Sequence, residues 1–233
     1  MQKPYVTMLM MTSIDGKIDG DFIDNHNEWL GDYYEALKLE ISDAWGNGSN
    51  THKKYFSDES VNLATFTGFV AEFSDNVIKD KFPYVVSFDS TGKVKWRNAA
   101  LTYPENVSNQ VLVVTTHKAK PEYIAYLKAN DIAYIFADDE SGEKIDIKIA
   151  LNKLYTLFGI KRFALTGGAI INAELLKADL VDEIRVLVAP YIDGSKNATI
   201  CESVDNKALT KAFKLDEVKK LKEDGLLLVY KKA

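Results

Sequence analysis

The 233-residue chain contains one cysteine, Cys201, and only three histidines, His26, His52 and His117. A single thiol forms no intrachain disulfide, and neither a Cys-x-x-Cys pair nor histidines at the spacing of metal ligands are present. The sequence therefore gives no support for a structural zinc site, and we expect no metal. A chain without a disulfide framework is typical of a reducing compartment, so we expect a cytoplasmic protein.

Basic residues are in the minority, with 29 Lys and Arg against 34 Asp and Glu and a net charge of −5. A nucleic-acid binder or a protein of anionic membrane surfaces needs a basic face, so we expect neither partner. The apolar stretch near the N-terminus is too short for a signal peptide or a membrane span. An anionic small molecule remains compatible, because a few local cations and backbone N–H groups suffice to hold it.

Strand-like runs alternate with helical patterns through the middle of the chain. Strands are expected at 5–11, 84–89, 111–116, 133–137, 162–166 and 183–192, and helices at 33–44, 121–130, 145–159 and 169–179. Asp146 is expected to cap the third helix and Gly159 to end it. This alternation predicts an α/β fold with a largely parallel sheet covered on both faces. We expect a single domain over residues 1–233, because no linker, repeat or low-complexity tract interrupts the chain.

The C-terminal segment has a different character. Two strand-like runs flank the turn Glu223-Asp224-Gly225, which predicts an antiparallel hairpin and hence a mixed sheet. The apolar run "IRVLVAPYI" (184–192) is expected near a sheet edge. An apolar edge strand needs covering, and this favours association of two copies.

Residues 162–171 read "RFALTGGAII", which is a strand, two glycines and the start of a helix. The third glycine of G-x-G-x-x-G and the Gly-Lys-Ser/Thr of a P-loop are both missing. A tight turn explains the glycines, since glycine tolerates positive φ. An anion site explains them equally well, because bare backbone N–H groups at a helix N-terminus bind phosphate.

Three other segments allow a plain and a functional interpretation. In "WGNGSNTHKKYF" (45–56), Thr51 either caps a helix or contacts phosphate. In "VVTTHK" (113–118), a strand ends with Thr115 and Thr116, whose hydroxyls either lie in an exposed turn or contact a ligand. In "TSIDGKID" (12–19), Asp15-Gly16 is explained by a hairpin turn, which makes Lys17 an ordinary exposed lysine.

The order of the blocks "PYVTMLMMTSIDGKI", "SDAWGNGSNT", "YVVSFDSTGK", "VLVVTT" and "TGGAIINAELLKADLVDEIRVLVAPYIDG" resembles the reductase domain of bacterial riboflavin biosynthesis. That domain belongs to the dihydrofolate-reductase-like superfamily, and the resemblance covers nearly the whole chain. It implies a dihydrofolate-reductase-like mixed, mostly parallel sheet flanked by helices. It also implies NADPH as cofactor, hydride transfer to a small heterocyclic or carbonyl-like substrate, and often a homodimer.

The resemblance also implies roles for individual residues. Lys17 and Asp15 are expected at the chemistry, and Ser13, Gly31 and Thr166 at the substrate. The cofactor is expected to contact Gly16, Gly48, Asn50, Thr51, Ser87, Thr115, Thr116, Gly167, Gly168, Ala169 and Ile170. The resemblance implies that the Gly-Gly turn cradles the pyrophosphate of the cofactor. Gly167 and Gly168 would then form both a tight turn and an anion site.

The sequence departs from the family pattern at three places. Thr166 stands where a glutamate is common, and Gly31 where a hydroxyl is common. Ser49 replaces an arginine, which removes one possible partner of the cofactor's 2′-phosphate. The H-x-E and P-C-x-x-C pair of a deaminase is also missing. We therefore expect a stand-alone NADPH-dependent reductase, and the alternatives are a non-catalytic nucleotide-binding or regulatory module and a flavodoxin-like flavin protein.

Overall fold

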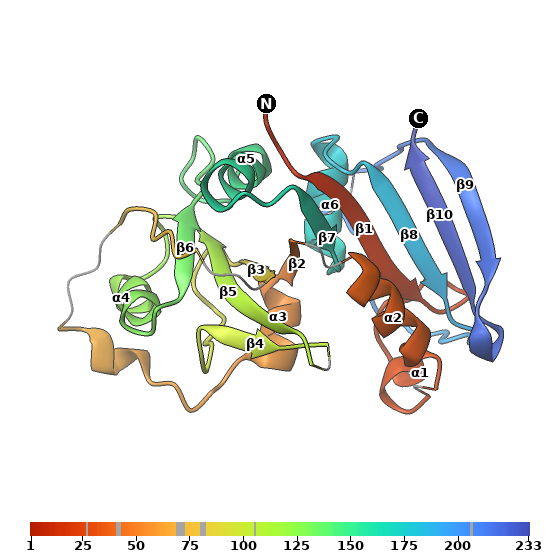
Figure 1. Ribbon diagram of the computed structural model, residues 1–233, viewed down its shortest axis with the longest axis horizontal. Helices are drawn as coiled ribbons and strands as arrows, with labels where there is room; N and C mark the ends of the chain where they lie inside the picture. The colour runs from red at the N-terminus through yellow and green to blue at the C-terminus, as the bar shows by residue number, and fades with distance from the viewer. Residues whose placement is uncertain (27, 41–42, 69–72, 80–82, 105, 206) are drawn as a thin grey trace. The chain divides into compact units, whose positions relative to one another are not determined.

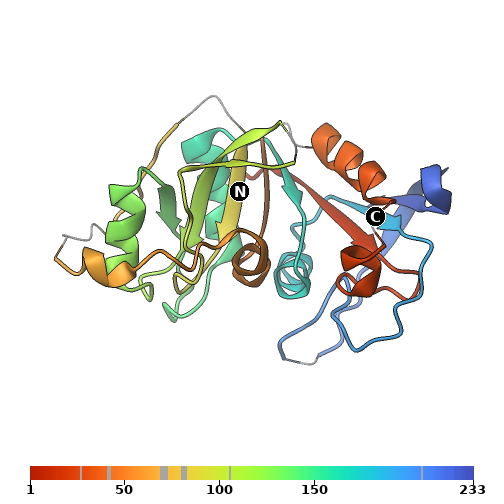
Figure 2. The same cartoon turned by 90° about the horizontal axis from the view of Figure 1, so that it is seen from below.

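The computed structural model describes residues 1–26, 28–40, 43–68, 73–79, 83–104, 106–205 and 207–233. Contacts within the chain divide it into two compact units (Figures 1 and 2). The central unit consists of Met1–Pro4 and Asp43–Lys161, and the terminal unit of Tyr5–Ser42 and Arg162–Ala233. The expectation of a single domain over 1–233 stays a prediction.

The central unit is built on parallel strands. The strands β2 (Ala44–Gly48), β3 (Tyr84–Phe88), β5 (Ser108–Thr115) and β6 (Ala133–Phe136) pair in parallel, and β4 (Ala100–Thr102) runs antiparallel to β5. Its helices are α3 (Ser49–Phe56), α4 (Pro121–Ala129), α5 (Ile147–Phe158) and the short 3₁₀ turn η1 (Leu63–Phe66). Every residue of β3 and of β6 is buried, as expected of parallel strands that are covered on both faces.

Helix α5 shows how local sequence sets an element's ends. The Asp146 carboxylate accepts hydrogen bonds from the backbone N–H groups of Lys148 and Ile149, and Gly159 ends the helix with φ of +73°. The carboxylate accepts from N–H groups of the first turn, and the N–H of Gly159 donates to carbonyls of the last turn, where a helix lacks partners of its own. The predicted cap and stop are confirmed.

Strand β2 was not among the predicted strands. Its sequence, "AWGNG", has few strand formers, and its first residue, Ala44, falls inside the predicted helix. A Cβ atom on Gly46 would lie 2.1 Å from the carbonyl oxygen of Val86 on β3. Glycine is therefore present because two backbones approach closely, which is a tertiary requirement that local patterns do not reveal.

The terminal unit has a mixed sheet in the order β7-β1-β8-β10-β9. The strands β7 (Arg162–Leu165), β1 (Tyr5–Thr12) and β8 (Glu183–Val188) are parallel, whereas β10 (Leu226–Lys232) is antiparallel to β8 and to β9 (Phe213–Lys220). The helices are α1 (Asp21–Asp24), α2 (Leu30–Glu40) and α6 (Ala169–Lys177). Figures 1 and 2 show α2 and α6 on opposite faces of β1.

The predicted C-terminal hairpin is confirmed. Strands β9 and β10 are joined through the short turn η2 (Lys222–Asp224), in which Glu223 and Asp224 both have positive φ. The mixed, mostly parallel sheet flanked by helices is confirmed as well.

Three details of the prediction are wrong. Strand β8 lies between β1 and β10 and is not an edge strand; the sheet ends at β9. Strand β8 also stops at Val188, shortly before Pro190, because proline cannot donate to the ladder. The predicted helix over 33–44 begins earlier, at Leu30, and does not reach Ala44, which is the first residue of β2. Its described part ends at Glu40, and residues 41–42 lie outside the described ranges.

Candidate functional site

The turn after β1 gathers four of the predicted site residues. The N–H of Ser13 donates to the carbonyl of Lys17 (2.9 Å), and the N–H of Lys17 donates to the Ser13 hydroxyl (3.0 Å). Gly16 has φ of +81°, which suits glycine. Strand β1 pairs in parallel with both β7 and β8, so the explanation of this turn as a β-hairpin is wrong.

The Asp15 carboxylate is engaged on both oxygens. It accepts from the Ser13 hydroxyl (2.7 Å) and from the backbone N–H groups of Asp193 and Gly194 (2.9 Å each). The Ser13 hydrogen bond and then the two backbone N–H groups hold the pKa of Asp15 well below its usual range. Asp15 is therefore ionised at neutral pH and clamps the segment around Asp193, and its assignment to the chemistry stays a prediction.

Lys17 lies in the same turn and is half-buried. Its ammonium donates to the carbonyl oxygen of Asn197 (3.0 Å), and its backbone forms an antiparallel bridge with Thr199. An ammonium group has three donors, so this contact fixes the side chain and leaves donors for an anionic or carbonyl group. The role of Lys17 in the chemistry stays a prediction.

The Gly-Gly turn connects β7 to α6. Gly167 has φ of +107°, Gly168 is the N-cap residue, and the peptide between them is cis. The first turn of α6 has no acidic residue and no side-chain cap, so its N–H groups and the positive end of the helix dipole are open to an anion. A Cβ atom on Gly167 would lie 3.2 Å from Cε of Met10, so the Met10 side chain would have to shift slightly, and the positive φ by itself disfavours any other residue. These features fit a pyrophosphate.

The remaining predicted residues of the terminal unit fall into two groups. Thr166 is half-buried, Ala169 is buried and Ile170 is 48% exposed, all beside the Gly-Gly turn. Because β1 and β7 pair in parallel, this turn and the Ser13–Lys17 turn leave the sheet at the same edge. Gly31 instead lies exposed in the first turn of α2, and nothing lies within 4 Å of where its Cβ would be.

The central unit places its predicted residues at strand ends. Gly48 ends β2 and is the N-cap of α3, while Asn50 and Thr51 lie in the first turn, so of the two interpretations of Thr51 the capping one is wrong. The cofactor contact of Thr51 stays a prediction. Thr115 ends β5 and Thr116 follows it. Because β2, β3 and β5 are parallel, these carboxyl ends lie along one edge of the central sheet, which is where ligands of α/β sheets bind.

Three predicted hydroxyl side chains of the central unit, Ser87, Thr115 and Thr116, are fully buried. The Thr116 hydroxyl donates to the carbonyl of Ser90 (2.9 Å). The hydroxyls of Ser87 and Thr115 have no hydrogen-bond partner among the described residues. The cofactor contacts assigned to these residues stay predictions.

Sequence reasoning overlooked residues 193–202 as part of the site. Asp193, Gly194, Asn197 and Thr199 all contact the Ser13–Lys17 turn. The only local signal was Asp193-Gly194, a dipeptide typical of any turn. Asp193 and Gly194 lie 178 and 179 positions from Asp15 in the sequence, and Asn197 lies 180 positions from Lys17. Only the folded chain reveals contacts over such separations.

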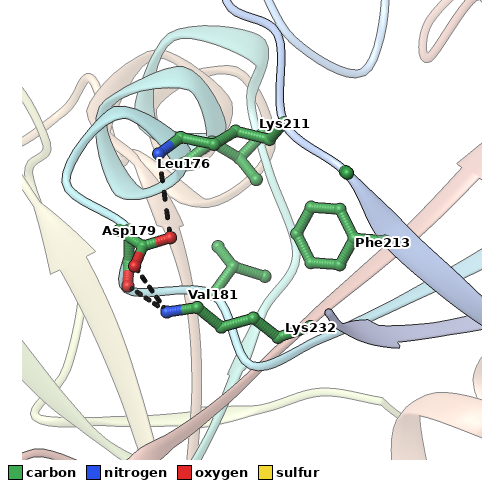
Figure 3. A pocket seen from close by; sticks show the side chains of 7 residues that line it. Leu176, Asp179, Val181, Lys211, Phe213 and Lys232 are labelled. Atoms are coloured by element: carbon green, nitrogen blue, oxygen red, sulfur yellow. Dashed lines mark hydrogen bonds and ion pairs between the residues drawn. The ribbon is translucent and has the colours of Figure 1, made fainter.

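A small pocket lies where the end of α6 meets the start of β9 (Figure 3). Figure 3 shows the Asp179 carboxylate between the ammonium groups of Lys211 (3.7 Å) and Lys232 (2.7 Å). Leu176, Val181 and Phe213 form its apolar wall. The charges are paired within the pocket, and none of the predicted site residues lines it.

No helix in the described ranges combines the length and the apolar character required to cross a bilayer. The cytoplasmic location expected from the sequence stays a prediction.

Comparison with known proteins gives a consistent result. The family model described as "RibD C-terminal domain" matches residues 4–227. A protein of Aquifex aeolicus named 2,5-diamino-6-ribosylamino-4(3H)-pyrimidinone 5′-phosphate reductase is 26% identical over 204 residues, which are 84% of this chain and 81% of that protein. A protein of the same name from Methanothermobacter thermautotrophicus is 31% identical over 87 residues, but this match spans only 37% of this chain and 38% of that protein.

Among solved structures, a pyrimidine reductase-like protein from Corynebacterium diphtheriae is similar with a TM-score of 0.69. The match covers 98% of this chain and 91% of that one at 16% identity. At this identity the likeness shows the fold alone.

Proposed function

Because this chain belongs to the RibD C-terminal domain family, we propose that it is an NADPH-dependent reductase of a ribosylated aminopyrimidinone phosphate. Membership confirms the resemblance seen in the sequence. It also makes the chain an oxidoreductase of the riboflavin-biosynthesis type, in preference to a non-catalytic nucleotide-binding module. The substrate is proposed from the shared name of relatives that are 24% and 26% identical to this chain.

The Gly-Gly turn is the observation that carries the proposed cofactor. The uncapped first turn of α6 and the positive φ of Gly167 support a pyrophosphate at this position. When bound, NADPH supplies the hydride that the reduction requires. The preference for NADPH over NADH is part of the proposal.

Lys17 is the residue that we assign to the reacting centre. Its ammonium is held by the carbonyl of Asn197, so it is fixed before substrate arrives. Preorganised charge of this kind is worth about 3 kcal/mol when charge develops in a transition state. Asp15 is ionised and bonded on both oxygens, which leaves Lys17 or solvent as the proton source.

The proposal is tested by cofactor titration and by NADPH oxidation in the presence of 2,5-diamino-6-ribosylamino-4(3H)-pyrimidinone 5′-phosphate. Cofactor at one hundred times its Kd adds about 2.7 kcal/mol of stability, which raises the melting temperature. Gly167→Val is expected to weaken NADPH binding by about 100-fold or more, because the side chain meets Met10 and resists positive φ.

Gly142→Val is the matched control. Gly142 also has positive φ, at +71°, but nothing lies within 4 Å of its Cβ position in the central unit. This variant carries the backbone strain without displacing Met10 or the Gly-Gly turn. If neither NADPH nor NADH shifts the melting temperature of the wild type, the proposed function is wrong.

We also propose that two copies of the chain associate through the α6-facing side of β8, β10 and β9. Tyr230 pairs with both Ile184 and Leu215, and Leu228 pairs with both Val186 and Val218. Directly paired residues share one face of a sheet, so three strands present apolar side chains together. On the edge strand β9, Leu215 and Val218 are each 56% exposed, which is a surface that a second copy would cover.

Light scattering tests this association. The wild type is expected to have the mass of a dimer at micromolar concentration, and Val218→Glu that of a monomer. Lys219→Glu is the control, because Lys219 neighbours Val218 on the strand and points to the other face. A monomeric wild type would contradict the proposal.

A further inference from the structure

Asn172 is a fully buried polar residue on the otherwise apolar inner face of α6. Its Nδ2 donates to the carbonyl of Ile200 (2.8 Å) and contacts Sδ of Met10 (3.3 Å). Its Oδ1 is buried and has no partner within the described part of the chain. A leucine has the same branching and the same number of side-chain heavy atoms without an unpaired oxygen, so the need for an apolar contact does not account for the amide.

The segment that Asn172 holds is residues 197–202, which we call the strap. At one end, Glu202 donates its N–H to the carbonyl of Ala169 in the first turn of α6 (3.2 Å). In the middle, Ile200 accepts from Asn172 (2.8 Å). The strap is therefore attached to the helix whose N-terminus is proposed to hold the cofactor.

The other end of the strap is attached to the lysine turn. Thr199 forms the antiparallel bridge with Lys17, and Ile18 donates its N–H to the carbonyl of Ala198 (3.0 Å). The carbonyl of Asn197 accepts from the Lys17 ammonium (3.0 Å). Movement of the strap would therefore move both the backbone and the ammonium of Lys17.

Met10 connects Asn172 to the Gly-Gly turn directly. The Met10 sulfur contacts the Asn172 amide, and its Cε lies 3.2 Å from where a Cβ of Gly167 would be. One buried amide thus touches the residue that packs under the turn and the strap that holds the lysine.

We infer that Asn172 is a positioning residue, which fixes the location of Lys17 relative to the Gly167-Gly168 turn through the strap. The inference rests on the proposed function, in which these two features hold the reacting centre and the cofactor. A displacement of about 1 Å at a reacting group can lower a rate by up to about 100-fold. Asn172 touches neither reactant in this scheme and acts through Lys17.

The first test measures the strap without any ligand. In Asn172→Leu, hydrogen exchange at the backbone amides of Ile18 and Glu202 is expected to become faster. Asn152→Leu is the matched control, because Asn152 also lies on a helix and donates its side-chain amide to a backbone carbonyl, that of Gln2 (3.0 Å). Unchanged exchange at Ile18 and Glu202 in Asn172→Leu would overturn the inference.

The second test measures turnover and cofactor affinity separately. Asn172→Leu is expected to lower kcat by about 10-fold or more while the Kd for NADPH changes by less than about 3-fold. In a Lys17→Met background the same substitution is expected to have no further effect on kcat, because Asn172 acts through that lysine. Additive losses in the double variant, or wild-type kcat in Asn172→Leu, would overturn the inference.

Asn172→Ala repeats both measurements with a smaller side chain, in case leucine disturbs folding. If wild-type protein binds no NADPH, the proposed function fails. The exchange experiment still reports whether Asn172 holds the strap. If wild-type protein turns over and both Asn172 variants match it, only the positioning role fails.

Discussion

The central and the terminal unit differ in how their buried polar side chains are satisfied. Eight buried side-chain nitrogen and oxygen atoms in the described residues have no hydrogen-bond partner, and seven of them belong to the central unit. They come from His52, Ser87, Asp89, Trp96, Gln110 and Thr115. Among the described residues of the terminal unit, only Oδ1 of Asn172 is of this kind.

The terminal unit joins the polar side chains of the turn after β1 into a connected set. Ser13, Asp15 and Lys17 each have a partner, and three of these partners lie in the segment Asp193–Asn197. A buried polar atom without a partner costs about 1–3 kcal/mol, and most such atoms of the described residues lie in the central unit. The terminal unit has a preorganised polar turn, which is what a reacting centre requires.

His52 illustrates the central unit. It is fully buried on α3 between Trp96 (5.2 Å between ring centroids), Phe56 (5.8 Å) and Trp45 (6.0 Å). Burial lowers the pKa of His52 to about 3. The imidazole is therefore neutral in the folded protein across the physiological range, and it behaves as one more ring of an aromatic cluster.

The largest effect on stability is expected from Gly46→Ala in the central unit. The added Cβ would lie 2.1 Å from the carbonyl oxygen of Val86, and backbone atoms cannot move away cheaply. We expect a loss of about 3 kcal/mol or more in urea unfolding. Gly31→Ala in α2 of the terminal unit is the control, and it should gain up to about 1 kcal/mol because nothing blocks its Cβ. Equal stability of the two variants would contradict the close approach of β2 and β3.

The next largest effect is expected from Lys17→Met, which removes the charge from the polar turn and keeps the length of the side chain. Turnover should fall by about 100-fold with nearly unchanged NADPH affinity, because the ammonium acts on the reacting centre. Lys222→Met is the control, since the Lys222 side chain is 75% exposed on the C-terminal hairpin. Wild-type turnover in Lys17→Met would remove this lysine from the chemistry.

His52→Phe is expected to change the pH dependence of stability. The pKa of His52 falls from 6.5 to about 3 on folding, so below pH 6.5 the unfolded chain binds a proton that the folded chain does not. The neutral imidazole therefore contributes fully to the free energy of unfolding above pH 6.5. As the pH falls from 6.5 towards 3, this contribution decreases by up to about 1.4 kcal/mol per pH unit. In His52→Phe, the free energy of unfolding should therefore depend less steeply on pH between pH 3 and 6.5 than in the wild type.

His26→Phe is the control for this slope, because the His26 side chain is 49% exposed in the terminal unit. It should retain the acid sensitivity of the wild type. An unaltered slope in His52→Phe would show that the buried imidazole does not contribute to it.

The smallest effect is expected from Asp15→Ala, which should loosen one segment without unfolding the protein. Loss of the carboxylate frees the backbone N–H groups of Asp193 and Gly194, so their hydrogen exchange should become faster. Asp139→Ala provides the matched change in the central unit, where a carboxylate accepts from Ser141 Oγ (2.7 Å) and from the N–H of Glu143 (3.1 Å). It should affect only its own turn. Unchanged exchange at Asp193 would refute the clamp assigned to Asp15.

Local signals in the sequence were sufficient for much of the fold. The cap at Asp146, the stop at Gly159 and the turn at Glu223–Gly225 all depend on residues within a few positions of one another. The same holds for the Gly167-Gly168 turn and for the order of strands and helices around it. The order of the quoted blocks along the chain also carried the family resemblance.

Other features depend on which strands become neighbours. Gly46 lies in a strand because its backbone meets that of Val86, and β8 is internal because the hairpin pairs with it. The partners of Asp15 and Lys17 lie about 180 residues away, and the partner of Asn172 lies 28 residues away. Helix caps and turns are encoded locally because their hydrogen bonds close within one or two turns of chain. Long-range hydrogen bonds and close backbone approaches exist only once the sheet has assembled, and so the tertiary structure alone decided which residues hold Lys17 in place.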